Sequence, residues 1–429
     1  MLKAGVRLLF QKEPAISRPT AELTDIAQVV LPYSFPTQAT VVPSVHLYDT
    51  VRKGTPLSAV EGDPLAVVRS SVTGVVGSER FVQHPLYGSL HCAVIDCLPD
   101  KPAPELPTPV SEHFTPEYIL QIAEQAGIVD ELDGVPLSLK LNDWQKNGCA
   151  FLVADAVEIQ PFASSAWAVL HDNAEQVLEG LRMAARCAAV LRYHIAVCLS
   201  GSRRRALAMR IGKQFLYQTD SYYPVTDLVH HGKKYGTHTI PHGAVFGRIG
   251  VQACLALYRA LFLSEPHSRC VLTVAGDAVP FPQNVSVPFG TTVQHVLEHC
   301  GLSEPPDYVI IGEQMTGTAA SALDIPVLPG MTCLLAFTAK ALRQPPAYPC
   351  IACGRCAQVC HAGLLPFEIV RRYQNMHYER LPSLHATDCD NCNACTFVCP
   401  SGIDLAAMVE ESKAASGGVF LNMEDEHNA

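Results

Sequence analysis

The sequence predicts a multidomain protein of mixed α/β and β class, and three observations support this prediction. The chain has 429 residues, enough for about three domains at roughly 150 residues each. Runs of short β-branched segments and regions in which strands alternate with helices occupy different parts of the chain. Two proline-rich stretches, 101–109 and 341–349, separate these parts and are typical of stiff linkers.

The first half of the chain divides into an arm and two domains. Residues 1–36 contain four prolines and are expected to form an extended N-terminal arm. In residues 37–100, β-branched runs punctuated by glycines predict a small β barrel or sandwich. Residues 110–262 begin with a helix, for which Thr115 is the expected N-cap, and continue with strand-like and amphipathic runs in alternation. This alternation predicts a Rossmann-like α/β domain with a parallel sheet.

The second half of the chain changes character twice. Residues 269–340 have the pattern of strands around one helix, which predicts a small mixed β domain. Residues 345–408 contain eight of the 17 cysteines and are expected to form a separate domain. Residues 409–429 are short and acidic, and we expect them to be a frayed tail.

Composition and charge exclude several classes of function. Hydrophobic residues make up 48% and charged residues 17%, as in globular rather than disordered chains. The net charge is 31 − 41 = −10, which provides no basic field for nucleic acid or anionic lipid. The N-terminus lacks a signal-peptide core, and no apolar run reaches the roughly 18 residues of a membrane span. We therefore expect a cytoplasmic protein that reaches the cytoplasmic face of a membrane only through a partner, with its cysteines reduced.

The clustered cysteines form two runs of the same spacing. Each run reads Cys-x-x-Cys-x-x-Cys-x-x-x-Cys, the ferredoxin pattern for [4Fe–4S] clusters, in which the fourth ligand of each cluster comes from the other run. Zinc is the alternative, but a zinc site takes four ligands and rarely needs the third Cys-x-x-Cys step. The other nine cysteines are expected in the core. The predicted ligand sets are Cys350, Cys353, Cys356 and Cys399 for the first cluster, and Cys389, Cys392, Cys395 and Cys360 for the second.

Beyond the cysteines, the chain resembles the C subunit of the Rnf electron-transport complex. The segments VHLYDTVRKGTPLSAV and RSSVTGVV are similar to the family's barrel-sandwich hybrid domain. VLTVAGDAVPFPQNVSVPFGTTVQHVLEHCG is similar to its β-grasp (SLBB) domain. YPCIACGRCAQVCHAGLLPFE resembles its first cluster run. The resemblance implies a ferredoxin-like dicluster 4Fe–4S domain at residues 345–408.

The resemblance also implies that the middle domain binds FMN and NADH, as does the flavin-binding subunit of complex I. The family's loop AGIVGLGGAGFPTHVKL appears here as AGIVDELDGVPLSLKLN, so Gly134 and Lys140 remain candidates for FMN binding. A later motif, resembling NGAECEPY, retains Glu158. The family's Gly-Gly-Glu-Lys segment for NADH is missing from the matching stretch SYYPVTDLVHH.

The acidic residues that enter the first of these loops argue against both cofactors. Asp130, Glu131 and Asp133 stand where glycines would let backbone N–H groups approach a phosphate, and their charges would repel it. We therefore favour a domain that has kept its fold and lost FMN and NADH over one that still binds them.

Three functions remain open after these observations. The favoured one is an electron-transfer subunit, with no catalytic residue of its own, that relays electrons through two [4Fe–4S] clusters between a partner oxidoreductase or complex subunit and a carrier such as ferredoxin or flavodoxin. The first alternative is an FMN-dependent NADH-oxidising subunit of an Rnf-type NAD:ferredoxin oxidoreductase. The second is a scaffold in which the clusters only stabilise the fold.

Overall fold

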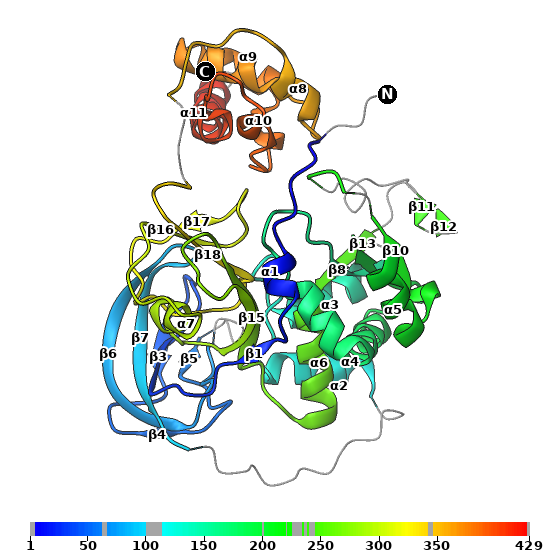
Figure 1. Cartoon of the computed structure of the whole chain (residues 1–429), viewed down its shortest axis with the longest axis vertical. Coiled ribbons are helices and arrows are strands. Elements are labelled where there is room, and N and C mark those ends of the chain that lie inside the picture. Colours follow the sequence, from blue (N-terminus) through cyan, green and yellow to red (C-terminus); the bar gives the residue numbers. More distant parts are fainter. Residues whose placement is uncertain are drawn as a thin grey trace.

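The computed structural model describes most of the chain (Figure 1). The proline-rich stretch 101–109, part of the second one and most of SYYPVTDLVHH lie outside the described residues. The described residues are 5–61, 67–99, 114–199, 201–219, 221–224, 234–235, 238–239, 245–341 and 346–426.

An antiparallel sheet near the N-terminus is built around one long hairpin. Buried and exposed side chains alternate at both ends of the first hairpin strand, whereas the partner strand has four consecutive buried residues. The hairpin turns at Gly88, whose φ of 70° favours glycine. The strand order is β2-β7-β6-β4, and a further pair, β3 with β5, lies beside it. The strands are β2 (Gln28–Pro32), β3 (Val41–Pro43), β4 (Thr50–Val51), β5 (Ser58–Val60), β6 (Gly74–His84) and β7 (Gly88–Cys97).

A mixed six-stranded sheet follows later in the chain, in the order β1-β15-β14-β18-β16-β17. Helix α7 (Val293–His299) begins at Thr292, whose side chain accepts a hydrogen bond from the His295 N–H. Buried residues of this sheet and of the first sheet form one continuous hydrophobic core, so the two sheets pack together. The strands are β1 (Ala21–Glu22), β14 (Arg269–Ala275), β15 (Gln283–Pro288), β16 (Tyr308–Ile311), β17 (Thr318–Ala319) and β18 (Cys333–Phe337).

The N-terminal segment differs from the extended arm expected for residues 1–36. Strand β1 pairs in parallel with β15, and β2 pairs with β7, so both sheets recruit a strand from this segment. The short helix α1 (Glu13–Ile16) packs on the mixed sheet. The prediction relied on the number of prolines alone. A proline at the end of a strand or at the start of a helix is compatible with that element, because no backbone N–H is needed there.

The α/β part has a four-stranded parallel sheet in the order β10-β9-β8-β13, covered by helices. Helices α4 and α6 cross closely at Gly180, where a Cβ would lie 1.9 Å from the Cys254 carbonyl oxygen. The strands are β8 (Cys149–Ala156), β9 (Tyr193–Val197), β10 (Leu216–Gln218) and β13 (Val245–Gly250). The helices are α2 (Pro116–Gln125), α3 (Leu137–Asn147), α4 (Ser165–Cys187), α5 (Gly201–Ile211), the 3-10 turn Lys213–Phe215 and α6 (Val251–Leu263); β11 (Lys234–Tyr235) and β12 (His238–Thr239) form a separate pair.

The cysteine-rich part forms a small helical unit at one end of the molecule (Figure 1). It has its own hydrophobic core, centred on Ile369, Leu381 and Val409. Helix α11 continues across the boundary at residue 409, where the sequence predicts the start of a frayed tail, because Val409 and Ser412 are buried in this unit. The elements are α8 (Arg355–Val359), α9 (Pro366–Gln374), α10 (Ala394–Phe397), α11 (Leu405–Glu426) and 3-10 turns at Tyr378–Arg380, Pro382–Leu384 and Ala386–Asp388.

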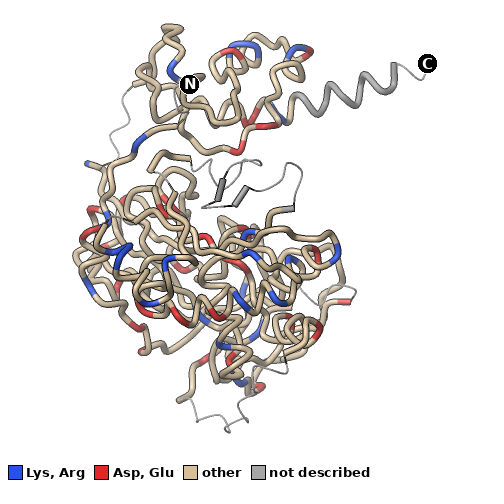
Figure 2. Tube along the Cα trace, turned by 90° about the vertical axis from the view of Figure 1, so that its right-hand side faces the viewer, with Lys and Arg blue, Asp and Glu red and all other residues tan. Residues whose placement is uncertain are grey.

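Two further properties concern the chain as a whole. Among the described residues, no helix combines the length and the apolar character needed to cross a membrane. Along the described trace, basic and acidic residues are interspersed rather than separated by sign (Figure 2).

Candidate metal centre

Two cavities in the cysteine-rich unit are each lined by four cysteines. One cavity is lined by the first predicted ligand set, and the other by the second. In both, three cysteines come from one run and the fourth comes from the other run. The first set is Cys350, Cys353, Cys356 and Cys399, and the second is Cys360, Cys389, Cys392 and Cys395.

The two runs reach these cavities with the same backbone geometry. Ala352 and Gly354 have positive φ angles of 52° and 74°, and Asn391 and Asn393, at the equivalent positions of the second run, have 58° and 61°. Left-handed turns at these places curl the chain so that successive cysteines face one side, and glycine and asparagine adopt them readily. A short helix, α8 or α10, begins directly after each turn.

The lining of both cavities fits a group of several iron ions. In the cavity of the second set, burial raises the pKa of Cys392 and Cys395 to about 12. A bound cation would stabilise the thiolate form there. Backbone N–H groups also point at sulfur, as Ala352 N does at Cys350 Sγ (3.4 Å). Such contacts are typical of cluster ligands.

The two ligand sets differ in their surroundings. Cys350 and Cys353 are exposed, whereas the second set is half-buried. Tyr223 Oη donates a hydrogen bond to the Cys392 carbonyl at 2.6 Å, and Asn393 Nδ2 donates one to the Met315 carbonyl at 2.7 Å. The second set therefore lies against the α/β part and the mixed sheet, whereas two cysteines of the first set, Cys350 and Cys353, face solvent.

A pair of side chains that the sequence does not predict as partners links the two cysteine runs. His361 Nε2 lies 2.7 Å from Asp390 Oδ2, and both residues line the cavity of the second set. His361 stands where the second run has Pro400, so the exchange of proline for histidine adds a contact between the runs.

A larger cavity, of about 520 Å3, lies at the carboxyl ends of strands β8, β9 and β10. Ligands of open α/β sheets bind at this edge. The N-terminal segment closes one side of the cavity with Phe10 and Lys12. Lys12 Nζ donates to the Glu158 carbonyl, and burial lowers the pKa of Lys12. Sequence reasoning missed Lys12 because no local pattern connects it to strands more than a hundred residues away.

The three candidate flavin residues do not converge on this cavity. Of Gly134, Lys140 and Glu158, only Glu158 lines it. Lys140 Nζ contacts Asp130 Oδ2 at 2.6 Å and Asp133 Oδ2 at 2.8 Å. Gly134, with a φ of 71°, directly follows Asp133, and its N–H donates to the Asp130 carbonyl at 2.9 Å. The two aspartates of the loop therefore bind Lys140, which lies in α3.

The carboxylate of Glu158 is also engaged within the chain. Its Oε1 accepts a hydrogen bond from Ala166 N at 2.8 Å, and its Oε2 accepts one from Trp167 N at 3.2 Å. These are N–H groups of the first turn of α4, which have no partner within the helix. Glu158 therefore acts as a distant cap of α4.

Glu131 occupies the N-terminus of α6 in the same way. Its Oε1 accepts from Gln252 N at 2.6 Å and its Oε2 from Ala253 N at 3.0 Å, while Asp130 Oδ1 accepts from Gly250 N at 3.0 Å. Gly250 permits this approach, because a Cβ there would lie 2.0 Å from the Glu131 carboxyl carbon. The structure thus corrects the expectation that Asp130 and Glu131 act by repelling a phosphate. Asp130 is buried and Glu131 is half-buried, and both carboxylates accept hydrogen bonds from backbone N–H groups at the start of α6.

Comparison with known proteins agrees with the class that this geometry defines, an iron–sulfur cluster domain attached to an α/β and β body. Residues 349–403 match the family described as a 4Fe-4S dicluster domain. Curated relatives match most of the chain, among them the following two. The C subunit of the ion-translocating oxidoreductase complex of Rhodobacter capsulatus is 28% identical over 363 residues, covering 81% of this chain and 70% of the relative. The C subunit of the Na(+)-translocating ferredoxin:NAD(+) oxidoreductase complex of Acetobacterium woodii is 26% identical over 402 residues, covering 90% of each.

The predicted resemblance to the C subunit of Rnf-type complexes is therefore confirmed. Among solved structures, a chain of the NAD+-reducing [NiFe]-hydrogenase in the air-oxidized state aligns with a TM-score of 0.46 and 13% identity, covering 70% of this chain and 61% of the other.

Proposed function

We propose that this protein is an electron-transfer subunit of an Rnf-type complex that holds two [4Fe–4S] clusters. The observation that carries the proposal is the pair of cavities, each lined by four cysteines drawn from both runs. When bound, such clusters each accept and donate one electron. The names of the relatives, which are subunits of ion-translocating and ferredoxin:NAD(+) oxidoreductase complexes, support assembly with partner subunits.

The environments of the two cysteine sets suit a relay with two ends. Cys392 and Asn393 hold the second set against the body through Tyr223 and Met315. In the first set, Cys350 and Cys353 are exposed, beside Ile351, whose exposed fraction is 68%. We propose that the second set exchanges electrons with the body side and the first set with a partner protein or carrier.

We further propose that the α/β part does not hold FMN or NADH. Glu131 occupies the helix terminus that a phosphate would need, and Lys140 is held by Asp130 and Asp133. A specific observation favours the alternative of an NADH-oxidising flavoprotein: the 520 Å3 cavity at the carboxyl edge is within the size range of cofactor sites. The flavin content of the purified protein decides between the loss of FMN and the NADH-oxidising flavoprotein.

The proposal is tested on protein purified anaerobically, with iron, sulfide and flavin counted on the same sample. We expect about eight irons per chain, bleaching by dithionite with reduced-cluster EPR signals, and no stoichiometric flavin. About one FMN per chain together with NADH-driven dye reduction would establish the flavoprotein alternative. Clusters that cannot be reversibly reduced would support the scaffold alternative.

A further inference from the structure

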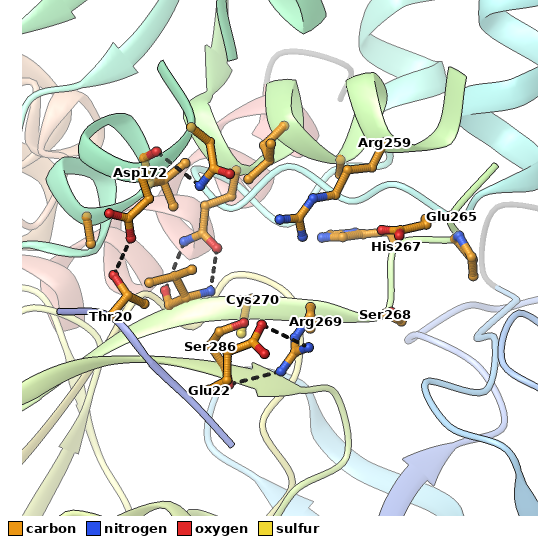
Figure 3. A pocket seen from close by; sticks show the side chains of 18 of the residues that line it. Thr20, Glu22, Asp172, Arg259, Glu265, His267, Ser268, Arg269, Cys270 and Ser286 are labelled. Atoms are coloured by element: carbon orange, nitrogen blue, oxygen red, sulfur yellow. Dashed lines mark hydrogen bonds and ion pairs between the residues drawn. The ribbon is translucent and has the colours of Figure 1, made fainter. Parts of the chain in front are cut away.

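A cavity of about 240 Å3 lies where helices α4 and α6 meet strands β1, β14 and β15 (Figure 3). It shares no lining residue with the cysteine cavities or with the carboxyl-edge cavity. Most of its lining comes from three parts of the chain: the N-terminal segment, the α/β helices and the mixed sheet. A loop of the first sheet adds Lys53.

Arg259 brings a positive charge to this cavity from α6 without an acidic partner among the described residues. It lies close to His267, and the burial of the imidazole together with the Arg259 charge lowers the pKa of His267 to about 4. His267 is therefore neutral at physiological pH, and its Nδ1 accepts a hydrogen bond from Val129 N at 3.3 Å. Within the described part of the chain, the guanidinium of Arg259 keeps its donors for another group.

Arg269 adds a second cation on the opposite side of the cavity (Figure 3). Its Nη1 lies 3.5 Å from Glu22 Oε1, and its Nη2 donates to the Ser286 carbonyl at 3.3 Å. Its Nε is buried and has no hydrogen-bond partner among the described residues. A buried donor without a partner is costly and points to an acceptor that the protein atoms do not provide.

Lys53 is held beside the cavity by its loop. Gly54, with a φ of 88°, lies against Pro266, where a Cβ would be 3.2 Å from the proline ring. The Gly54 N–H donates to the Ser70 carbonyl at 2.8 Å. The described residues provide no acidic partner for the Lys53 ammonium.

Three acidic side chains line the cavity beside the three basic ones: Glu22, Asp172 and Glu265. Glu22 contacts Arg269, and Asp172 accepts a hydrogen bond from Thr20 at 2.6 Å. Glu265 lies on the exposed turn after α6, where solvent screens its charge. Arg259 and Lys53 line the cavity, and neither has an acidic partner among the described residues.

We propose that this cavity binds a compact oxyanion with two negative charges, of the phosphate or small dicarboxylate class, between Arg259, Lys53 and Arg269. Guanidinium groups bind carboxylates and phosphates through paired N–H donors, which suits a small ligand in a cavity of this size. The inference is independent of the electron-transfer function, because the site lies apart from the cysteines and from the carboxyl edge.

The test is isothermal titration calorimetry of the cluster-loaded protein with inorganic phosphate and, separately, with succinate, at constant ionic strength. We expect one saturable site per chain for at least one of the two anions. Arg259→Gln and Lys53→Gln should each weaken binding by about tenfold or more, because each removes a charge-assisted contact. The matched control is Arg205→Gln, an exposed arginine of α5, which should leave binding unchanged.

Two results would overturn the proposal: no saturable binding of either anion up to about 10 mM, a concentration that detects even millimolar affinity, or equal binding by all three variants. Lys53 lies on an exposed loop, so its variant keeps the test decisive if Arg259→Gln fails to fold. Iron content and circular dichroism of each variant separate loss of the anion site from loss of the clusters or of the fold.

Discussion

The Oε2 atom of Glu131 accepts a hydrogen bond from the backbone N–H of Ala253 at 3.0 Å, across 122 residues of sequence. This contact closes the N-terminus of α6 with a carboxylate from the loop that resembles a flavin-binding loop. An N–H group at a helix start is a strong anion ligand, and here the anion is a side chain. The contact therefore supports the proposal that the α/β part does not hold FMN.

Replacing Glu131 should destabilise the protein, and comparing two substitutions separates the effect of its hydrogen bonds from the effect of its charge. Burial and the nearby Asp130 raise the pKa of Glu131, and the hydrogen bonds from the Gln252 and Ala253 N–H groups oppose this shift. Glu131→Ala should lower the free energy of unfolding by about 1 to 2 kcal/mol, as for loss of a helix cap. Glu131→Gln keeps a hydrogen-bond acceptor and should lower the free energy of unfolding by less. Urea unfolding followed by circular dichroism measures both, with Glu124→Ala on the exposed face of α2 as control. Equal losses for Ala and Gln would contradict the capping role.

Removing the amino group of Lys140 should leave a buried charge without its partner. The Asp130 side chain is fully buried and Lys140 is 12% exposed. Lys140→Met should therefore lower stability by about 3 kcal/mol or more. Lys146→Met, in the last turn of the same helix, is the control and should have little effect. The double variant Lys140→Met with Asp130→Asn should recover part of the loss, and failure to recover any would show that the ion pair is not its cause.

Replacing a single cysteine by serine should remove the iron held by its own set and leave the iron of the other set in place. We expect Cys353→Ser and Cys392→Ser each to lose about half of the iron, because each cluster needs four thiolates. Cys187→Ser is the control, because Cys187 is a buried cysteine of α4 outside both runs. Iron and sulfide analysis with EPR of the reduced protein measures the outcome. A Cys353→Ser protein with full iron content would contradict the ligand assignment.

His84 should make stability depend on pH. It is buried, its Nε2 lies 3.2 Å from the Pro326 carbonyl, and burial lowers its pKa to about 4. The unfolded chain, with an ordinary histidine pKa, binds more protons between these values, so stability present above about pH 6.5 is lost as the pH falls toward 4. Through His84, the free energy of unfolding should fall by about 1 kcal/mol as the pH is lowered from 7.5 to 5.5.

The pH effect is measured from urea midpoints at these two pH values. His84→Gln should reduce the difference between them, whereas His46→Gln, at a side chain that is 79% exposed, should not. An unchanged difference in the His84 variant would assign the acid sensitivity to other groups.

Local patterns predicted much of this molecule. Thr115 caps α2, where its side chain accepts a hydrogen bond from Tyr118 N, because capping depends only on residues within one turn. The N-terminal segment was harder to predict. Its strands β1 and β2 form by pairing with the distant strands β15 and β7. A local sequence pattern does not indicate which distant strand a segment will pair with.

The cysteine spacing by itself determined the two proposed ligand sets, because three cysteines within seven residues must face a common centre when the chain turns between them. Only the tertiary structure decided what the acids of the α/β loop do. The loop sequence shows three negative charges, but a charge acts according to its burial and its partners. Folding buries Asp130 beside Lys140 and places Glu131 on the N-terminus of α6, so an apparent repulsive surface becomes an internal anion.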